Sequence, residues 1–225
     1  MRRAAAFALP ALLLAGCAAA SQAPAQTDAL TIENRYPLEY AKQFTVDVCA
    51  GSYDLITIDG SRYLVVPEGA AAPANLDADI TVLQQPIQNI YLVSSSAMDP
   101  IISIGGLGAV ALSGTQAENW YLDAARTAME QGEIAYAGKY SAPDYETILS
   151  ADCGLAIENT MIYHTPEVKE QLEKFGVPVL VERSSYESDP LARMEWVKLY
   201  GILLGRTEEA ERVFDDAVQR IAPLL

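Results

Sequence analysis

Between residues 89 and 181, short apolar runs alternate with segments of helical periodicity. The first run, 90–93, is continuous rather than alternating, which is typical of a strand buried on both faces. Helical patterns follow at 120–131 and from Thr165-Pro166 onward. Parallel strands need such a crossover between them, so the alternation predicts β-α-β units and a parallel sheet. Further strands are expected at 109–112, 133–136, 155–157 and 177–181, and further helices at 100–107 and from Ser141, which we expect to cap its helix.

The region 31–86 has a different pattern. Residues 44–48 alternate between apolar and polar, and two apolar runs, 55–58 and 62–66, flank the pair Asp59-Gly60. Glycine tolerates the positive φ of a tight turn, so this arrangement predicts a β-hairpin. We therefore expect a β-rich extension ahead of the parallel sheet.

After Tyr186 the pattern is helical, and Gly205 interrupts it. In the second helix Ala210, Val213, Phe214, Ala217 and Ile221 fall on one stripe. An apolar stripe has to be covered by another element, and no strand follows it in the sequence. This pattern leads us to expect an incomplete chain, in which the helical segment 187–225 continues toward a further unit.

The N-terminus has the pattern of an export signal. Arg2 and Arg3 precede an apolar run at 4–14, which is too short for a membrane span of ~20 residues but suits a secretory signal. The run ends in Leu-Ala-Gly-Cys, similar to a bacterial lipobox, so Cys17 is the expected lipidation site. A lipid there would hold the protein at the outer face of the cell membrane. Residues 18–30 are expected to form a flexible tether.

Charge and motif content exclude several classes of protein. The formal net charge of −15 argues against nucleic-acid partners, which need a cationic face. No G-x-S-x-G elbow is present, and the glycines at 105–108 lack dinucleotide-binding spacing, so we expect no enzyme activity and no cofactor. The single histidine, His164, has no partners for a metal site. Cys49 and Cys153 could pair in an oxidising compartment or remain buried thiols.

Four segments in this order resemble the periplasmic-binding-protein family that serves siderophores, haem and cobalamin. They are 89–99, 144–157, Leu172–Leu180 with its Phe-Gly-Val-Pro-Val, and 196–211. In 144–157 Cys153-Gly154 stands where the family has Pro-Asp, and the extension before residue 89 lies beyond the minimal family core. The resemblance implies two α/β lobes with the ligand in the cleft between them, of which this chain would contain the first.

The resemblance implies an α/β fold, a Rossmann-like parallel-sheet lobe with a β-hairpin-rich extension before it and an inter-lobe helical segment after it. It also implies an extracytoplasmic lipoprotein that delivers a metal chelate or corrinoid to an ABC permease. The alternative is a single-lobe surface lipoprotein that binds a protein partner. The expected division is 1–17 signal peptide, 18–30 tether, 31–86 extension, 87–186 lobe and 187–225 helices toward a second lobe.

Ligands of open α/β sheets gather beyond the carboxyl ends of the strands. Hydroxyls and amides there could hydrogen-bond a chelate, Arg183 could pair with an anionic one, and tyrosines could flank a planar one. The same residues could equally cap helices and finish turns. The predicted ligand contacts are Ser95, Ser96, Met98, Tyr140, Glu158, Asn159, Arg183 and Tyr186.

Glu146 is assigned by the resemblance alone. In the family a glutamate at this helix position docks on arginines of the permease. An ordinary solvated helix glutamate is the alternative.

Overall fold

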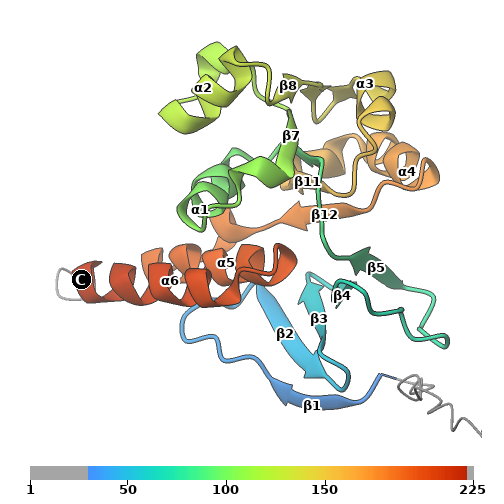
Figure 1. The fold of residues 1–225 in the computed structure, drawn as a ribbon, viewed down its shortest axis with the longest axis vertical. Coiled ribbons are helices and arrows are strands. Elements are labelled where there is room, and N and C mark those ends of the chain that lie inside the picture. Colours follow the sequence, from blue (N-terminus) through green and yellow to red (C-terminus); the bar gives the residue numbers. More distant parts are fainter. Residues whose placement is uncertain (1–29, 222–225) are drawn as a thin grey trace, which may run out of the picture.

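The computed structural model describes residues 30–221, which form two five-stranded sheets with helices around them (Figure 1). The signal peptide, Cys17 and all but the last residue of the tether fall outside the described residues and remain predictions. Within 30–221, no helix combines the length and the hydropathy that a membrane crossing requires.

The first sheet is built from the extension. Its strands lie in sequence order and are antiparallel, except that the last two run parallel. They are β1 (Ile32–Arg35), β2 (Phe44–Cys49), β3 (Tyr53–Ile58), β4 (Ser61–Val66) and β5 (Ile80–Gln84). The predicted β-rich extension is therefore confirmed.

The hairpin predicted from Asp59-Gly60 connects β3 to β4, and Ile58 pairs with Ser61 across it. Both turn residues have positive φ, 47° for Asp59 and 83° for Gly60. A two-residue turn of this kind needs left-handed backbone at both positions, which aspartate tolerates and glycine prefers. Local chemistry thus fixes where the hairpin tip lies.

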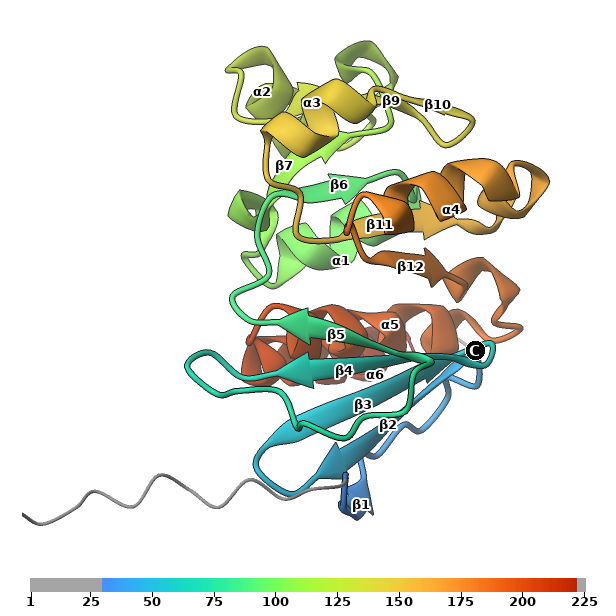
Figure 2. The ribbon, with the colours of Figure 1, turned by 90° about the vertical axis from the view of Figure 1, so that its right-hand side faces the viewer.

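The second sheet is parallel throughout, with the order β12-β11-β6-β7-β8 (Figure 2). Its strands are β6 (Ile90–Leu92), β7 (Val110–Ser113), β8 (Ala135–Tyr136), β11 (Ala156–Asn159) and β12 (Val179–Glu182). The predicted α/β fold with a parallel sheet is confirmed, because each apolar run became a strand and the segments between them became crossovers.

The crossovers contain short helices and single turns. The α-helices of this half are α1 (Met98–Ser103), α2 (Asp123–Glu130), α3 (Tyr145–Ser150) and α4 (Pro166–Lys174). The 3₁₀ turns are η1 (Ser95–Ala97), η2 (Leu107–Ala109), η3 (Ala117–Asn119), η4 (Thr160–His164) and η5 (Ser184–Tyr186), and a small hairpin joins β9 (Gly138–Lys139) to β10 (Ala142–Pro143).

Three helix starts differ from the prediction. The helix expected at 120–131 begins at Asp123. The helix expected at 100–107 occupies 98–103, directly after η1. The helix expected to be capped by Ser141 is capped by Asp144, whose carboxylate accepts the N–H of Thr147 at 3.1 Å. Ser141 instead lies in the turn between β9 and β10, a hairpin that the sequence did not indicate.

The helices α5 (Pro190–Leu203) and α6 (Thr207–Ile221) pack beside the first sheet (Figures 1 and 2). Trp196 of α5 meets Phe44 of β2 with ring centroids 4.9 Å apart. Phe214 of α6 meets Tyr40, and Ala210 is fully buried. In the apolar stripe of α6, Ala210, Phe214 and Ala217 are thus buried among the described residues, and Val213 and Ile221 are half-buried.

One apolar cluster joins both sheets through α5. It contains Phe44 from the first sheet, Leu92 and Leu180 from the second, and Trp196 between them. A second cluster lies on the other face of the parallel sheet, under α3 and α4. Because the two sheets share a core, the boundaries at 86 and 186 mark changes of topology, and the division into domains remains a prediction.

Candidate functional site

The carboxyl ends of the parallel strands meet at one edge of the second sheet, toward the right of Figure 2. The turns η1, η4 and η5 follow β6, β11 and β12 at this edge. We call it the strand-end rim. Parallel strand ends place backbone and side chains from distant parts of the chain side by side, which is where open α/β sheets bind ligands.

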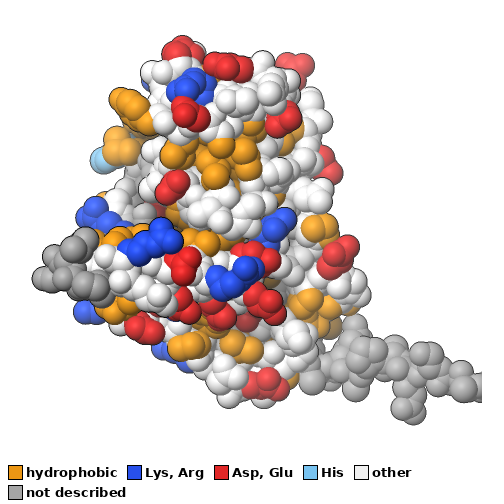
Figure 3. Space-filling view, turned by 60° about the vertical axis from the view of Figure 1, so that its left-hand side comes forward, with side chains coloured by type: hydrophobic (Ala, Val, Ile, Leu, Met, Phe, Trp, Pro, Cys, Tyr) orange, Lys and Arg blue, Asp and Glu red, His pale blue; other side chains and the backbone are white. Residues whose placement is uncertain are grey.

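All four exposed tyrosines of the described chain follow strand ends at this rim. Their exposed fractions are 98% for Tyr121 after β7, 43% for Tyr136 at the end of β8, 48% for Tyr163 after β11 and 54% for Tyr186 after β12. Figure 3 shows the only histidine, His164, beside hydrophobic side chains on this side of the molecule. Trp120, which directly precedes Tyr121, is buried.

A buried carboxylate holds two strand ends together beneath the rim. Glu182 accepts the hydroxyls of Ser94 at 2.9 Å and Ser96 at 2.8 Å on one oxygen, and the N–H of Ser184 at 2.7 Å on the other. Glu182 closes β12 and Ser94 follows β6, so the carboxylate bridges two strands that flank β11. Sequence reasoning missed Glu182, although an acid directly after the apolar run 177–181 was a visible signal.

Ser95 and Ser96 are exposed at the rim, as the prediction requires. Ser96 also lines a cavity of about 360 Å³ between η5, α1, α5 and α6. Serine hydroxyls, the charged side chains of Asp99 and Arg193, and the apolar side chains of Met194, Val197 and Val213 all line this cavity. The cavity therefore offers both polar and apolar groups next to the strand ends.

Met98 is a correction to the predicted set of ligand contacts. Its side chain is fully buried in the main core, because α1 begins at this residue and turns it inward. A side chain with no exposed surface cannot touch a ligand at the rim.

Glu158 is also fully buried, and neither carboxylate oxygen has a hydrogen-bond partner in the described chain. Burial raises its pKa to about 8, because the charged form loses its hydration. The side chain is therefore a neutral acid at pH 7, below the rim rather than on it. The predicted ligand contact of Glu158 has no exposed atom.

Two other predicted contacts also have structural roles. The Asn159 side chain accepts the N–H of Met161 at 2.9 Å and so caps η4, the alternative weighed from the sequence. Tyr140 is half-buried and packs against the second core cluster. The ligand contacts of Asn159 and Tyr140 remain predictions.

Arg183 is paired within the protein. Its Nη1 lies 2.7 Å from a carboxylate oxygen of Asp59 at the tip of the β3–β4 hairpin. Its guanidinium carbon lies 4.5 Å from the ring centroid of Tyr186, a cation–π distance. The predicted pairing of Arg183 with an anionic ligand would thus compete with Asp59.

Glu146 lies in the first turn of α3 and is exposed. With Glu133 and Thr147 it lines a hollow of about 470 Å³ between α3 and β8. Its side chain is therefore placed where a cationic partner could reach it, and its role in docking remains a prediction.

Cys49 and Cys153 are both free and buried, and burial raises the pKa of each thiol. Among residues 30–221, no three His, Cys, Asp or Glu side chains gather closely enough to hold a metal ion.

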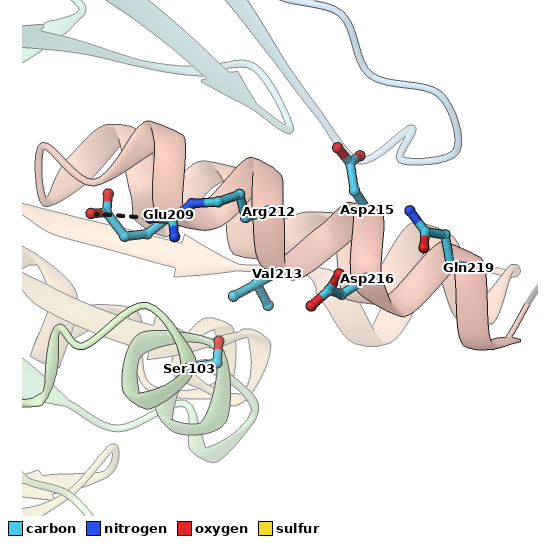
Figure 4. Close-up of a pocket in the computed structure, with 7 residues that line it drawn as sticks. All are labelled: Ser103, Glu209, Arg212, Val213, Asp215, Asp216 and Gln219. Carbon is cyan, nitrogen blue, oxygen red and sulfur yellow. Dashed lines mark ion pairs between the residues drawn. The ribbon is translucent and has the colours of Figure 1, made fainter.

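A further hollow of about 460 Å³ lies between α6 and Ser103 of α1 (Figure 4). Val213 points toward Ser103, whereas Asp215 points to the opposite side of the helix. Arg212 pairs with Glu209 at 3.6 Å. Helix surfaces rather than strand ends form this hollow, and its polar side chains diverge, so we place the candidate site at the rim.

The chain matches no protein-family model. It is 21% identical over 174 residues to the uncharacterized lipoprotein MJ0878 of Methanocaldococcus jannaschii, a match that covers 71% of this chain. The chain spans 41% of the length of that relative.

The solved structures similar to this chain include periplasmic binding proteins. A haem-binding protein from Pseudomonas aeruginosa is 22% identical with a TM-score of 0.49, covering 60% of this chain and 45% of its own. The haem-binding protein HutB of Vibrio cholerae has 16% identity, a TM-score of 0.48, and coverages of 61% and 49%. The vitamin B12-binding protein BtuF of Vibrio cholerae has 14% identity, a TM-score of 0.43, and coverages of 62% and 50%.

Proposed function

We propose that the chain is the ligand-capturing lobe of an extracytoplasmic solute-binding lipoprotein. Its ligand would be a haem, a cobalamin-type corrinoid or an iron–siderophore, delivered to an ABC importer. The protein would act by binding rather than by catalysis, held at the membrane through a lipid on Cys17.

The observation that carries this proposal is the position of the exposed tyrosines. Four aromatic rings stand at the carboxyl ends of four parallel strands. Exposed rings cost hydration free energy unless something covers them, and flat conjugated ligands pack well on aromatic faces. A ligand that spans the rim could touch several of these rings at once.

The hydroxyl groups of the rim support the same function. Ser96 donates its proton to Glu182, so its lone pairs remain available to a donor on the ligand. A few fixed polar groups among apolar ones are the usual composition of a small-molecule site. Glu146, which lies on helix α3, would then face the permease.

The test is equilibrium binding of haemin, cyanocobalamin and a ferric tris-catecholate to the full-length protein, followed by titration calorimetry and fluorescence quenching. We expect one of the three to bind with a dissociation constant of about 1 μM or lower. Tyr136→Ala and Tyr163→Ala should each weaken that binding roughly threefold to tenfold.

Phe175→Ala is the matched control, because Phe175 is similarly exposed but ends α4, at the opposite edge of the sheet. Its affinity should stay within about twofold of the parent. Absence of binding for all three probes, or equal losses in the control, would contradict the proposed function.

A further inference from the structure

The tip of the extension's hairpin reaches the strand-end rim of the parallel sheet. Asp59 contacts Arg183 at 2.7 Å across 124 positions of sequence. The Nε of Arg183 also donates to the Gln43 side chain at 3.4 Å, just before β2. Two parts of the extension therefore hold one guanidinium at the end of β12.

This guanidinium lies directly at the proposed binding surface. It sits over the ring of Tyr186, and the Tyr186 hydroxyl donates to Thr160 at 3.4 Å, at the start of η4. The side chain of Arg183 is only 16% exposed, whereas that of Asp59 is 51% exposed. The half-exposed Asp59 carboxylate thus neutralises the largely buried Arg183 guanidinium. A ligand that covers Tyr186 would lie close to this ion pair.

The second guanidinium of this region, Arg193, is used differently. It donates to the backbone carbonyls of Glu187 at 3.0 Å and Ser185 at 3.3 Å, which fixes the end of η5. These acceptors are neutral backbone groups, and the charge of Arg193 is the same in every variant of Asp59. The difference in affinity between anionic and neutral ligands therefore depends on the Asp59–Arg183 pair.

We propose that Asp59 is a specificity-determining residue of the rim: by neutralising Arg183 it lowers the affinity for anionic chelates relative to uncharged ligands. The inference rests on the proposed function and adds to it which charge class the rim selects. A desolvated cation that is already paired offers an incoming anion little attraction, and a ligand carboxylate or catecholate would meet the Asp59 charge as well.

The backbone conformation at Asp59 allows Asp59→Asn to test the effect of the negative charge alone. Asp59 has φ 47° in a two-residue turn before Gly60. Asparagine tolerates the left-handed region at least as well as aspartate, and Asn-Gly is a favoured sequence for this turn. The variant should keep the hairpin and remove only the negative charge.

The experiment measures the ratio of association constants for a polyanionic ferric tris-catecholate and for neutral cyanocobalamin, on the full-length protein at low salt. Asp59→Asn should raise this ratio roughly fivefold or more, because the Arg183 charge becomes available. The double variant Asp59→Asn with Arg183→Gln should lose that gain. Raising the ionic strength to about 0.5 M should shrink the gain, as salt screens exposed charge.

Glu173→Gln is the control for net charge. Glu173 is a similarly exposed carboxylate that pairs with Lys169 in the last turn of α4, at the opposite edge of the sheet. Its ratio should stay within about twofold of the parent.

Each outcome is decisive. An unchanged ratio in Asp59→Asn, or a gain that persists without Arg183, overturns this inference while ligand binding itself keeps the proposed function intact. Failure of parent and variant to bind either probe overturns the inference, and it overturns the proposed function only if haemin also fails to bind.

Discussion

The Glu195 carboxylate on α5 accepts a hydrogen bond from the backbone N–H of Tyr40 at 2.8 Å, which ties the segment before β2 to the helix that covers the first sheet. The same carboxylate accepts the N–H groups of Glu39 at 2.9 Å and Ala41 at 2.8 Å, and the ammonium of Lys198 at 2.8 Å. Glu195 is fully buried, so these four donors replace its hydration.

Glu187 repeats this arrangement on the next residues of the segment. It accepts the N–H groups of Lys42 and Gln43 and the indole N–H of Trp196 at 3.1 Å. Two buried carboxylates therefore hold five consecutive backbone amides of an irregular segment, 39–43, that no sheet or helix satisfies. This is how the extension is fixed to α5, and through it to the parallel sheet.

Glu195→Gln should destabilise the protein by about 2–4 kcal/mol, because the glutamine NH2 group cannot accept the two hydrogen bonds that one carboxylate oxygen accepts, and Lys198 loses its buried anionic partner. The measurement is the free energy of unfolding from urea titration. Glu130→Gln, the same change at an exposed position that ends α2, should stay within about 0.5 kcal/mol of the parent. Equal effects of the two changes would mean that the network adds no stability.

The stability that Glu195 provides should decrease as the pH falls. Burial raises the pKa of Glu195, but hydrogen bonds from Ala41, Lys198, Glu39 and Tyr40 outweigh it, so the net pKa lies below the ordinary 4.5. A depressed carboxyl pKa stabilises the fold above the unfolded-state value and loses that effect as pH falls through the folded-state value. The gap between parent and Glu195→Gln should therefore narrow as pH drops below 4.5. A gap that widens in acid would contradict this assignment.

The contribution of Glu158 to stability should have the opposite dependence on pH. Its pKa is raised from 4.5 to about 8, so the folded protein binds a proton that the unfolded chain has released between these values. Stability from this group falls as pH rises through that window, by an amount of order 2–4 kcal/mol. Glu158→Gln keeps the shape without the ionisation, so its stability should exceed that of the parent at pH 8 and approach it near pH 4.5. Parallel pH profiles for the two proteins would show that Glu158 has a normal pKa.

Features with local causes could be predicted from the sequence. The Asp59-Gly60 turn was predicted because its chemistry lies in two adjacent residues, and the parallel sheet because each apolar run is its own signal. Gly176, with φ 82°, ends α4 for the same local reason. The rim followed from topology, since strand ends gather whatever the side chains are.

Features with distant causes could not be predicted. Glu195 meets Tyr40 across 155 positions, and Arg183 meets Asp59 across 124, so no window of sequence contains both partners. The burial of Met98 escaped prediction because it depends on where α1 begins, and α1 begins directly after η1, two residues earlier than expected. Predicting which rim residues face a ligand requires these three-dimensional partners.

The N-cap of α3 is Asp144, whereas the sequence predicted Ser141, and substitutions at the two positions can distinguish them. Asp144 accepts both the N–H and the hydroxyl of Thr147, and these hydrogen bonds lower the pKa of Asp144. Asp144→Ala should therefore lower the urea midpoint of unfolding, whereas Ser141→Ala, in the preceding hairpin turn, should leave that midpoint nearly unchanged. Urea denaturation of both variants decides between the two residues. A larger loss from Ser141→Ala would restore the cap expected from the sequence.

The proposed role of Glu146 requires that its charge matter to transport and not to capture. Glu146 is exposed in the first turn of α3, beside a hollow that it shares with Glu133, and the strand-end rim is formed by other segments. Glu146→Lys should therefore leave the affinity for the bound probe within about twofold and reduce ligand-dependent uptake by cells roughly tenfold, because like charges then meet at the permease.

Glu170→Lys is the matched control, since Glu170 is an exposed glutamate on α4. Uptake should fall only in the first variant. If both variants transport normally, Glu146 is a solvated helix residue and the permease contact lies elsewhere; if both lose uptake equally, the effect is one of overall charge and not of docking.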